Sequence, residues 1–177
     1  ATPPPLLALE THGRADALVD AAGDPSVDTS DTVGLLSAIF PLRIDSSDPQ
    51  RVGGLLAAIP GDGVDYGLLR YLRADTARQL AEFAEPQLLL NYLGRADLDG
   101  NAESGLRLER KLLADVTPLP EPDLAVRHEV AIFATIVTIG EQSALLTQWR
   151  VLPDIVNETE LATLLTIWHE VLRELGT

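Results

Sequence analysis

Apolar runs separated by turn residues follow one another along the first half of the chain, and their lengths suit strands. Leu6 to Leu9 is a short apolar run after a proline-rich lead, and we expect a buried strand that ends at Glu10. Val33 to Leu42 is a longer apolar stretch and predicts a second strand, with Pro41 near its end. Gln87 to Leu93 predicts a third strand.

Helical spacing appears between the predicted strands. Asp45 to Pro49 supplies an N-cap and a proline suited to a first helical turn, and the next apolar positions fall on one helical face. We expect two more short helices, one beginning at Leu68 and one running from Asp75 to Phe83. Ala15 to Ala22 also has a helical pattern.

The last third of the chain has the two clearest local signals. Val126 to Ile139 is rich in β-branched residues, and Gly140 to Ser143 can turn it back onto a strand from Ala144 to Val151. Asn157 followed by Glu160 predicts a capped helix start. The apolar positions after this cap form one helical stripe that we expect to pack on the sheet: Leu161, Leu164, Leu165, Trp168, Val171, Leu172 and Leu175.

These elements predict an α+β fold in which a mixed sheet is flanked by helices. We expect one unit over residues 1–177, with a surface loop at residues 97–105, where Asp, Gly, Asn, Glu and Ser dominate. The chain begins at Ala1 and contains no Met, so we expect it to be part of a longer polypeptide.

Composition removes several classes of function. The formal net charge of -14 repels phosphate backbones and anionic lipid surfaces, which argues against nucleic-acid and membrane partners. The chain has no Cys, which excludes thiolate catalysis and is compatible with the cytoplasm. The three His residues, at positions 12, 128 and 169, are not spaced as a metal-ligand pair, so no metal site is predicted.

Four short segments carry the chemistry-bearing residues. In chain order they are Glu10-Thr11-His12-Gly13-Arg14-Ala15, Asp31-Thr32-Val33-Gly34-Leu35-Leu36-Ser37, Pro60-Gly61-Asp62-Gly63-Val64-Asp65-Tyr66-Gly67 and Leu90-Asn91-Tyr92-Leu93-Gly94. We call them motifs 1 to 4. Any one of these motifs would be weak evidence of a resemblance to a known family, but four in this order and at these intervals are strong evidence.

In this order and spacing the motifs resemble the last four motifs of epimerization domains of nonribosomal peptide synthetases, which are members of the condensation-domain superfamily. The resemblance covers about residues 6 to 95, and the tail from Ile132 to Leu175 fits the family more loosely. The chain departs from the family pattern chiefly in motifs 1 and 2: Ala15 replaces an acid, Asp31 an arginine, and Leu35 and Leu36 replace aromatic residues. Asp65 and Leu90 are smaller departures in motifs 3 and 4.

The resemblance implies a fold similar to chloramphenicol acetyltransferase, with two similar lobes and a tunnel between them. The chain would be the C-terminal lobe, and its partners would be the N-terminal lobe of the same domain and a peptidyl carrier protein. The carrier would present the substrate on a phosphopantetheine arm, and the chain would bind no cofactor of its own. The family's His-His-x-x-x-Asp-Gly motif is absent from the sequence, so the isolated lobe is expected to be inactive and, with its inner surface exposed, prone to self-association.

The implied reaction converts an L- to a D-aminoacyl or peptidyl thioester by removing and replacing the Cα proton. Glu10 would be one acid–base group, opposite a histidine of the other lobe. Asn91 and Tyr92 would donate hydrogen bonds to the thioester oxygen as enolate charge develops. Each residue also has a purely structural interpretation, in which Glu10 caps local donors and Asn91 and Tyr92 satisfy a strand end.

Two other functions remain open at this point. A condensation domain would form amide bonds on the same fold, although the glutamate of motif 1 and the Asn-Tyr-Leu-Gly of motif 4 favour epimerization. A catalytically degenerate docking platform would explain the departures in motifs 1 and 2. Among the other polar candidates, we interpret His12 as structural, the glycines of motif 3 as a turn, and the basic cluster Arg107, Arg110 and Lys111 as a solvated helix face.

Overall fold

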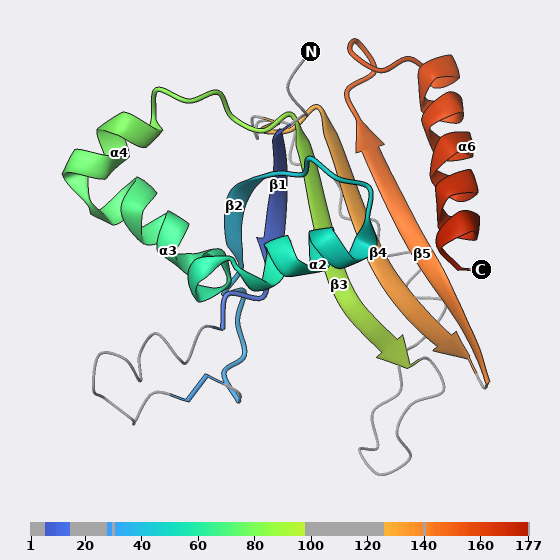
Figure 1. Ribbon diagram of the computed structural model, residues 1–177, viewed down its shortest axis with the longest axis horizontal. Helices are drawn as coiled ribbons and strands as arrows, with labels where there is room; N and C mark the ends of the chain where they lie inside the picture. The colour runs from blue at the N-terminus through green and yellow to red at the C-terminus, as the bar shows by residue number, and fades with distance from the viewer. Residues whose placement is uncertain (1–5, 15–27, 30, 98–125, 140, 177) are drawn as a thin grey trace.

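The computed structural model describes residues 6–14, 28–29, 31–97, 126–139 and 141–176, and a five-stranded mixed sheet forms the centre of this part of the chain (Figure 1). The strands are β1 (Leu6–Thr11), β2 (Ala38–Arg43), β3 (Leu88–Asp97), β4 (Val130–Ile139) and β5 (Gln142–Val151). Their order across the sheet is β2-β1-β3-β4-β5. β1, β3 and β4 are parallel, while β2 and β5 pair antiparallel at the two edges, so the predicted α+β class is confirmed.

A helical segment connects β2 to β3, and a long helix follows β5. The connecting elements are α2 (Pro49–Ala57), η1 (Pro60–Gly63), α3 (Val64–Gly67), η2 (Leu68–Leu72) and α4 (Ala74–Leu80). In Figure 1, α2 crosses in front of the sheet, and the last helix, α6 (Glu158–Leu175), runs alongside β5. None of the described helices is long and apolar enough to cross a membrane.

Capping residues explain where α2 and α6 begin. The Asp48 side chain accepts a hydrogen bond from the backbone N–H of Gln50 at 3.0 Å, and Pro49 occupies the first helical position. At α6 the Asn157 side chain accepts from the backbone N–H of Glu160, whose carboxylate accepts from the Asn157 N–H, each at 3.0 Å. This reciprocal capping box confirms the predicted start of the last helix.

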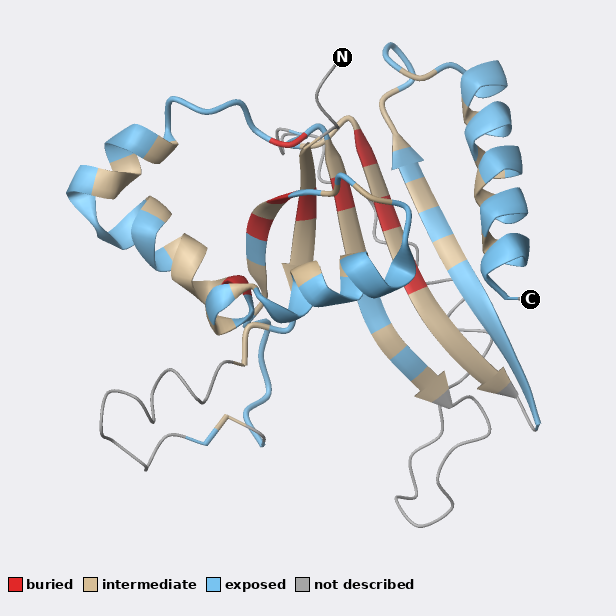
Figure 2. Ribbon diagram, in the orientation of Figure 1, coloured by how far each residue is buried: buried red, intermediate tan, exposed pale blue. Residues whose placement is uncertain are grey.

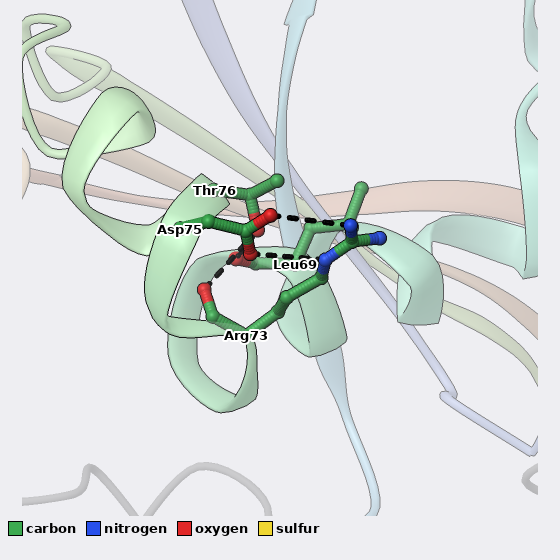
Figure 3. Close-up of polar contacts among 4 residues, drawn as sticks. All are labelled: Leu69, Arg73, Asp75 and Thr76. Carbon is green, nitrogen blue, oxygen red and sulfur yellow. Dashed lines mark hydrogen bonds and ion pairs between the residues drawn. The ribbon is translucent and has the colours of Figure 1, made fainter.

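Polar contacts stabilise the junction between η2 and α4 (Figure 3). The Arg73 guanidinium donates two hydrogen bonds to the Asp75 carboxylate, at 3.0 and 3.1 Å. Thr76 Oγ1 donates to the carbonyl oxygen of Leu69 at 2.7 Å, which satisfies a carbonyl in η2. The hydrogen bonds from Arg73 lower the pKa of the exposed Asp75 carboxyl below its ordinary value of 3.8.

The two faces of the sheet differ in what covers them, because successive strand residues point to opposite sides. Phe40, Ile132 and Trp149 share one face through the strand register. Gly63 of η1 approaches the Phe40 ring, and Trp168 of α6 meets Trp149 edge to face, with ring centroids 5.5 Å apart. We call this the helix-covered face and the opposite side the open face.

The buried residues lie mainly on the strands, and the helices are largely exposed (Figure 2). The buried apolar side chains among the described residues are Ala8, Phe40, Leu42, Leu89, Val130, Ile132 and Ala134. The core of the described part of the chain is therefore centred on the sheet.

The structure corrects one predicted strand. Val33 to Leu42 was expected to be a single strand, but β2 begins only at Ala38, and the side chains of Val33 and Leu35 are 101% and 90% exposed. Among the described strands β2 pairs with β1, whose last paired residue, Thr11, faces Ala38. Because no described strand lies beside the chain before Ala38, its backbone does not continue the ladder.

Other predicted elements differ in their ends or lie outside the described residues. The glycine-rich turn of motif 3 contains left-handed residues at 61–63, as a turn requires, but its second half is the helix α3. The predicted hairpin of β4 and β5 is confirmed. The predicted helix at residues 15–22 lies outside the described residues, as do residues 98–105 of the predicted loop; Asp97 ends β3.

Candidate active site

Glu10 and Asn91 form a side-chain pair although 81 residues separate them along the chain. They face each other across the parallel pair of β1 and β3, and Asn91 Nδ2 donates a hydrogen bond to Glu10 Oε2 at 2.7 Å. Both residues are half-buried. The parallel register is the cause of this contact, because residues in register on neighbouring strands point to the same face.

The pair belongs to one row of residues that crosses all five strands on the open face. In strand order the row contains Ile39, Glu10, Asn91, Phe133 and Gln148. At the edges of the sheet the row is uncovered, because Ile39 is 43% exposed and Gln148 is also exposed. The carboxylate–amide pair thus lies in the middle of a sheet face that no described helix covers.

Tyr92 lies on the other side of the same strand. It pairs with Ala134, a buried residue of the helix-covered face, and its own side chain is 48% exposed. The alternation of β3 therefore brings Glu10 and Asn91 together and separates Tyr92 from them. The strand becomes irregular immediately afterwards, where Gly94 has a φ of 85°.

Motif 1 holds motifs 2 and 3 in place around the end of β1. Gly13 has a φ of 64°, and a Cβ at this position would overlap the carbonyl oxygen of Leu36 in motif 2. Thr11 Oγ1 donates a hydrogen bond to the carbonyl oxygen of Asp62 in motif 3 at 2.8 Å. Through these contacts the three motifs lie close together in space although they are distant in sequence.

Arg14 adds a further connection between motifs 1 and 2. Its guanidinium donates hydrogen bonds to the carbonyl oxygens of Thr29 and Thr32, the latter at 2.8 Å. The backbone N–H of Arg14 donates to His12 Nδ1 at 3.0 Å. His12 therefore has a local hydrogen-bonding contact, and its structural role stays a prediction.

A cleft of about 440 Å³ opens beside the end of β1. Its lining includes Gly13 of motif 1, Leu36 of motif 2, Gly63 and Gly67 of motif 3, and Tyr71 of η2. Neither Glu10 nor Asn91 lines this cleft, although Ile39, the neighbour of Glu10 on β2, does. The three motifs therefore shape a hollow next to the carboxylate–amide pair rather than around it.

The Glu10–Asn91 pair has the groups needed for proton transfer, but it lies on an open face of the sheet and not inside the cleft. A half-buried carboxylate can accept and return a proton, and an amide that holds one of its oxygens fixes the direction of the other. Asn91 has a second N–H that can donate to an oxygen of a bound molecule. The predicted basic cluster Arg107, Arg110 and Lys111 lies outside the described residues, so its place relative to this site is not described.

Comparison with known sequences finds similarity to nonribosomal peptide synthetases. The chain is 37% identical over 102 residues to bacitracin synthase 2 of Bacillus licheniformis, which covers 54% of this chain and 4% of that protein. It is 36% identical over 121 residues to nonribosomal peptide synthetase 4 of Gibberella zeae, covering 63% of the chain and 2% of that protein. No family model matches the chain.

Comparison with solved structures finds the same fold. The epimerization domain from the third module of tyrocidine synthetase B matches with a TM-score of 0.69 at 20% sequence identity. The match covers 98% of this chain and 37% of that domain's chain. The predicted chloramphenicol acetyltransferase-like architecture is therefore confirmed. The chain has the fold of about a third of a nonribosomal peptide synthetase epimerization domain, and its sequence is similar to short segments of such synthetases.

Proposed function

We propose that the chain is the C-terminal lobe of an epimerization domain, which converts an L- to a D-aminoacyl or peptidyl thioester on a carrier protein. The observation that carries this proposal is the 2.7 Å hydrogen bond between Asn91 and Glu10 in the middle of the open face. The fold shared with an epimerization domain and the order of the four motifs support it. The N-terminal lobe would close the open face and form the second wall of the substrate tunnel.

In this reaction Glu10 exchanges the Cα proton on one side of the substrate. The Asn91 amide holds Glu10 Oε2, so Oε1 is the oxygen directed at the substrate. When a base removes the proton, negative charge moves from Cα to the thioester oxygen, and the second N–H of Asn91 stabilises that charge. A histidine of the N-terminal lobe returns the proton from the opposite side, which inverts the configuration at Cα.

The role of Tyr92 stays a prediction. Its phenol leaves β3 on the helix-covered side and thus points away from an oxygen bound beside Asn91 on the open face. We expect Tyr92→Phe to reduce activity much less than substitution of Glu10 does. A loss comparable to that of the Glu10 variant would show that the phenol contacts the substrate.

The decisive measurement is the conversion of the L- to the D-residue in the complete polypeptide that supplies both lobes and the loaded carrier. Glu10→Gln keeps the shape of the side chain and its contact with Asn91 but removes one of the two acid–base groups, so inversion at Cα should be abolished. Unchanged formation of the D-residue in this variant would remove Glu10 from the mechanism.

The chain contains a matched control for this substitution. Glu129 also accepts a hydrogen bond from a side-chain amide, that of Gln87 at 3.1 Å, and precedes β4. Glu129→Gln therefore removes a carboxylate from a similar local pair outside the proposed site. It should leave formation of the D-residue unchanged while Glu10→Gln abolishes it.

Product analysis separates the two alternative functions. A D-residue formed without a new amide bond supports epimerization, and amide formation supports a condensation domain instead. If neither a D-residue nor an amide forms, the result supports a docking platform. The replacements at Asp31, Leu35 and Leu36 favour that alternative.

A further inference from the structure

An aromatic residue continues the row that contains Glu10 and Asn91, and a cationic residue lies in the neighbouring row on the same face. Phe133 of β4 is in register with Asn91, and Arg150 of β5 lies one row away on the same open face. The Arg150 guanidinium carbon lies over the Phe133 ring, 4.7 Å from its centroid. Since neighbouring strands are about 4.8 Å apart, the guanidinium lies roughly 5 to 10 Å from Asn91.

The guanidinium N–H groups of Arg150 are available to bind a ligand. Its residue is exposed, and its contact with Phe133 uses the flat face of the guanidinium, so the N–H groups at the rim remain available. No described residue places a carboxylate within ion-pair distance of it. Gln148 is the next residue in the row beyond Phe133, and its exposed amide adds another donor on the same face.

Phe133 fixes where the guanidinium can be. An arginine at the edge of a sheet would ordinarily extend into solvent, but the aromatic face of Phe133 attracts the cation and holds it over β4. Ala131, in register with Arg150, is small and leaves room for the side chain to fold back. The result is a positioned cation on the same surface as the proposed proton-transfer pair.

We infer that Arg150 and Phe133 recognise the substrate's own side chain and favour an acidic one. This inference rests on the proposed function, which places the substrate's Cα beside Glu10. A side chain that extends from there along the row passes Phe133 and reaches Arg150. A single guanidinium with one neighbouring amide suits a carboxylate, which arginine binds with two parallel hydrogen bonds.

The test compares glutamyl and glutaminyl substrates, which differ in charge but not in shape. The complete polypeptide is loaded with L-Glu, L-Gln or L-Leu on its carrier, and kcat/KM for deuterium exchange at Cα is measured. The wild type should favour Glu over Gln about tenfold to a hundredfold, as expected for a hydrogen-bonded ion pair. Arg150→Met should abolish this preference by lowering kcat/KM for Glu far more than for Gln or Leu, while Arg150→Lys should retain part of it.

The phosphopantetheine arm also carries an anionic group, its phosphate, which is the same in all three substrates. If Arg150 bound that phosphate, Arg150→Met would lower kcat/KM for Glu, Gln and Leu equally, and that result would overturn the inference. A wild type without preference for Glu would overturn it as well. The substitution is on the exposed side of an edge strand, so loss of folding is not expected, and near-ultraviolet circular dichroism checks this.

Binding of unreactive substrate analogues separates this inference from the proposed function. Glutamyl and glutaminyl pantetheine in which an amide replaces the thioester are titrated into the same polypeptide. Tighter binding of the glutamyl analogue that is lost in Arg150→Met supports the inference, whether or not exchange is detected. Absence of exchange would count against epimerization but not against recognition of an acidic side chain. Exchange with every substrate but equal binding of both analogues supports epimerization and refutes the inference.

Discussion

Two glycines of motif 3 should respond in opposite ways to the same substitution. Gly63 has a φ of 91°, and a Cβ there would lie 2.8 Å from Phe40 Cγ and closer still to two other carbons of that ring. Gly67 has an ordinary helical φ of -59°, and a Cβ there would meet nothing within 4 Å. We therefore expect Gly63→Ala to destabilise the fold and Gly67→Ala to leave it intact.

The size of the Gly63 effect follows from two contributions. A residue with a Cβ in the left-handed region costs about 1 to 2 kcal/mol. Displacing a packed ring costs about 1 to 3 kcal/mol more, and Phe40 is only 5% exposed, so it has little room to move. The total of about 2 to 5 kcal/mol is a large share of the stability of an ordinary domain.

Urea unfolding followed by circular dichroism measures both variants against the wild type. Gly67→Ala should be neutral or stabilise by up to about 1 kcal/mol, because alanine is the better helix former. If Gly63→Ala and Gly67→Ala had equal midpoints, the close approach of η1 to Phe40 would be wrong. Gly67 also lines the cleft beside β1, so its substitution would reduce the space there without harming the fold.

Three further predictions concern stability. Asn157→Ala removes the capping box of α6 and should cost about 1 kcal/mol in urea unfolding. Thr11→Val removes the hydrogen bond to Asp62 and should cost about 1 kcal/mol, with Thr166→Val on exposed α6 as the control. Burial, with a smaller contribution from Glu85, raises the pKa of Tyr66 above 10.0, so the free energy of unfolding should decline as pH rises past 10. Tyr66→Phe should flatten that decline in an alkaline titration, and an unchanged slope would contradict the assignment.

Local signals in the sequence predicted the helix starts, which depend on residues close together in the chain. The Asn157 cap and Pro49 place the starts of two helices, because capping depends on residues three or four positions apart. The strand predicted from Val33 began five residues too early, because hydrophobicity alone does not show whether a neighbouring strand is present. The start of β2 is set by the end of β1, because Thr11, the last residue of β1, pairs with Ala38.

The candidate site depended on contacts that no local pattern contains. The parallel pairing of β1 with β3 could not be read from periodicity, and the association of Glu10 with Asn91 came from the family resemblance. The same resemblance grouped Tyr92 with Asn91, whereas strand alternation separates them. Phe133 and Arg150 were missed, because their relation appears only when the hairpin register of β4 and β5 is known.

The contact between Glu10 and Asn91 has a consequence for how this protein can evolve. Each side chain reaches the open face only because of its odd or even place in its strand, so inserting or deleting one residue within β1 would turn Glu10 toward the helices. Changes of length at this position would thus delete the carboxylate from the row without altering its codon. Homologous chains that retain the activity should therefore vary in the lengths of their loops while keeping the spacing from Ala8 to Glu10 constant.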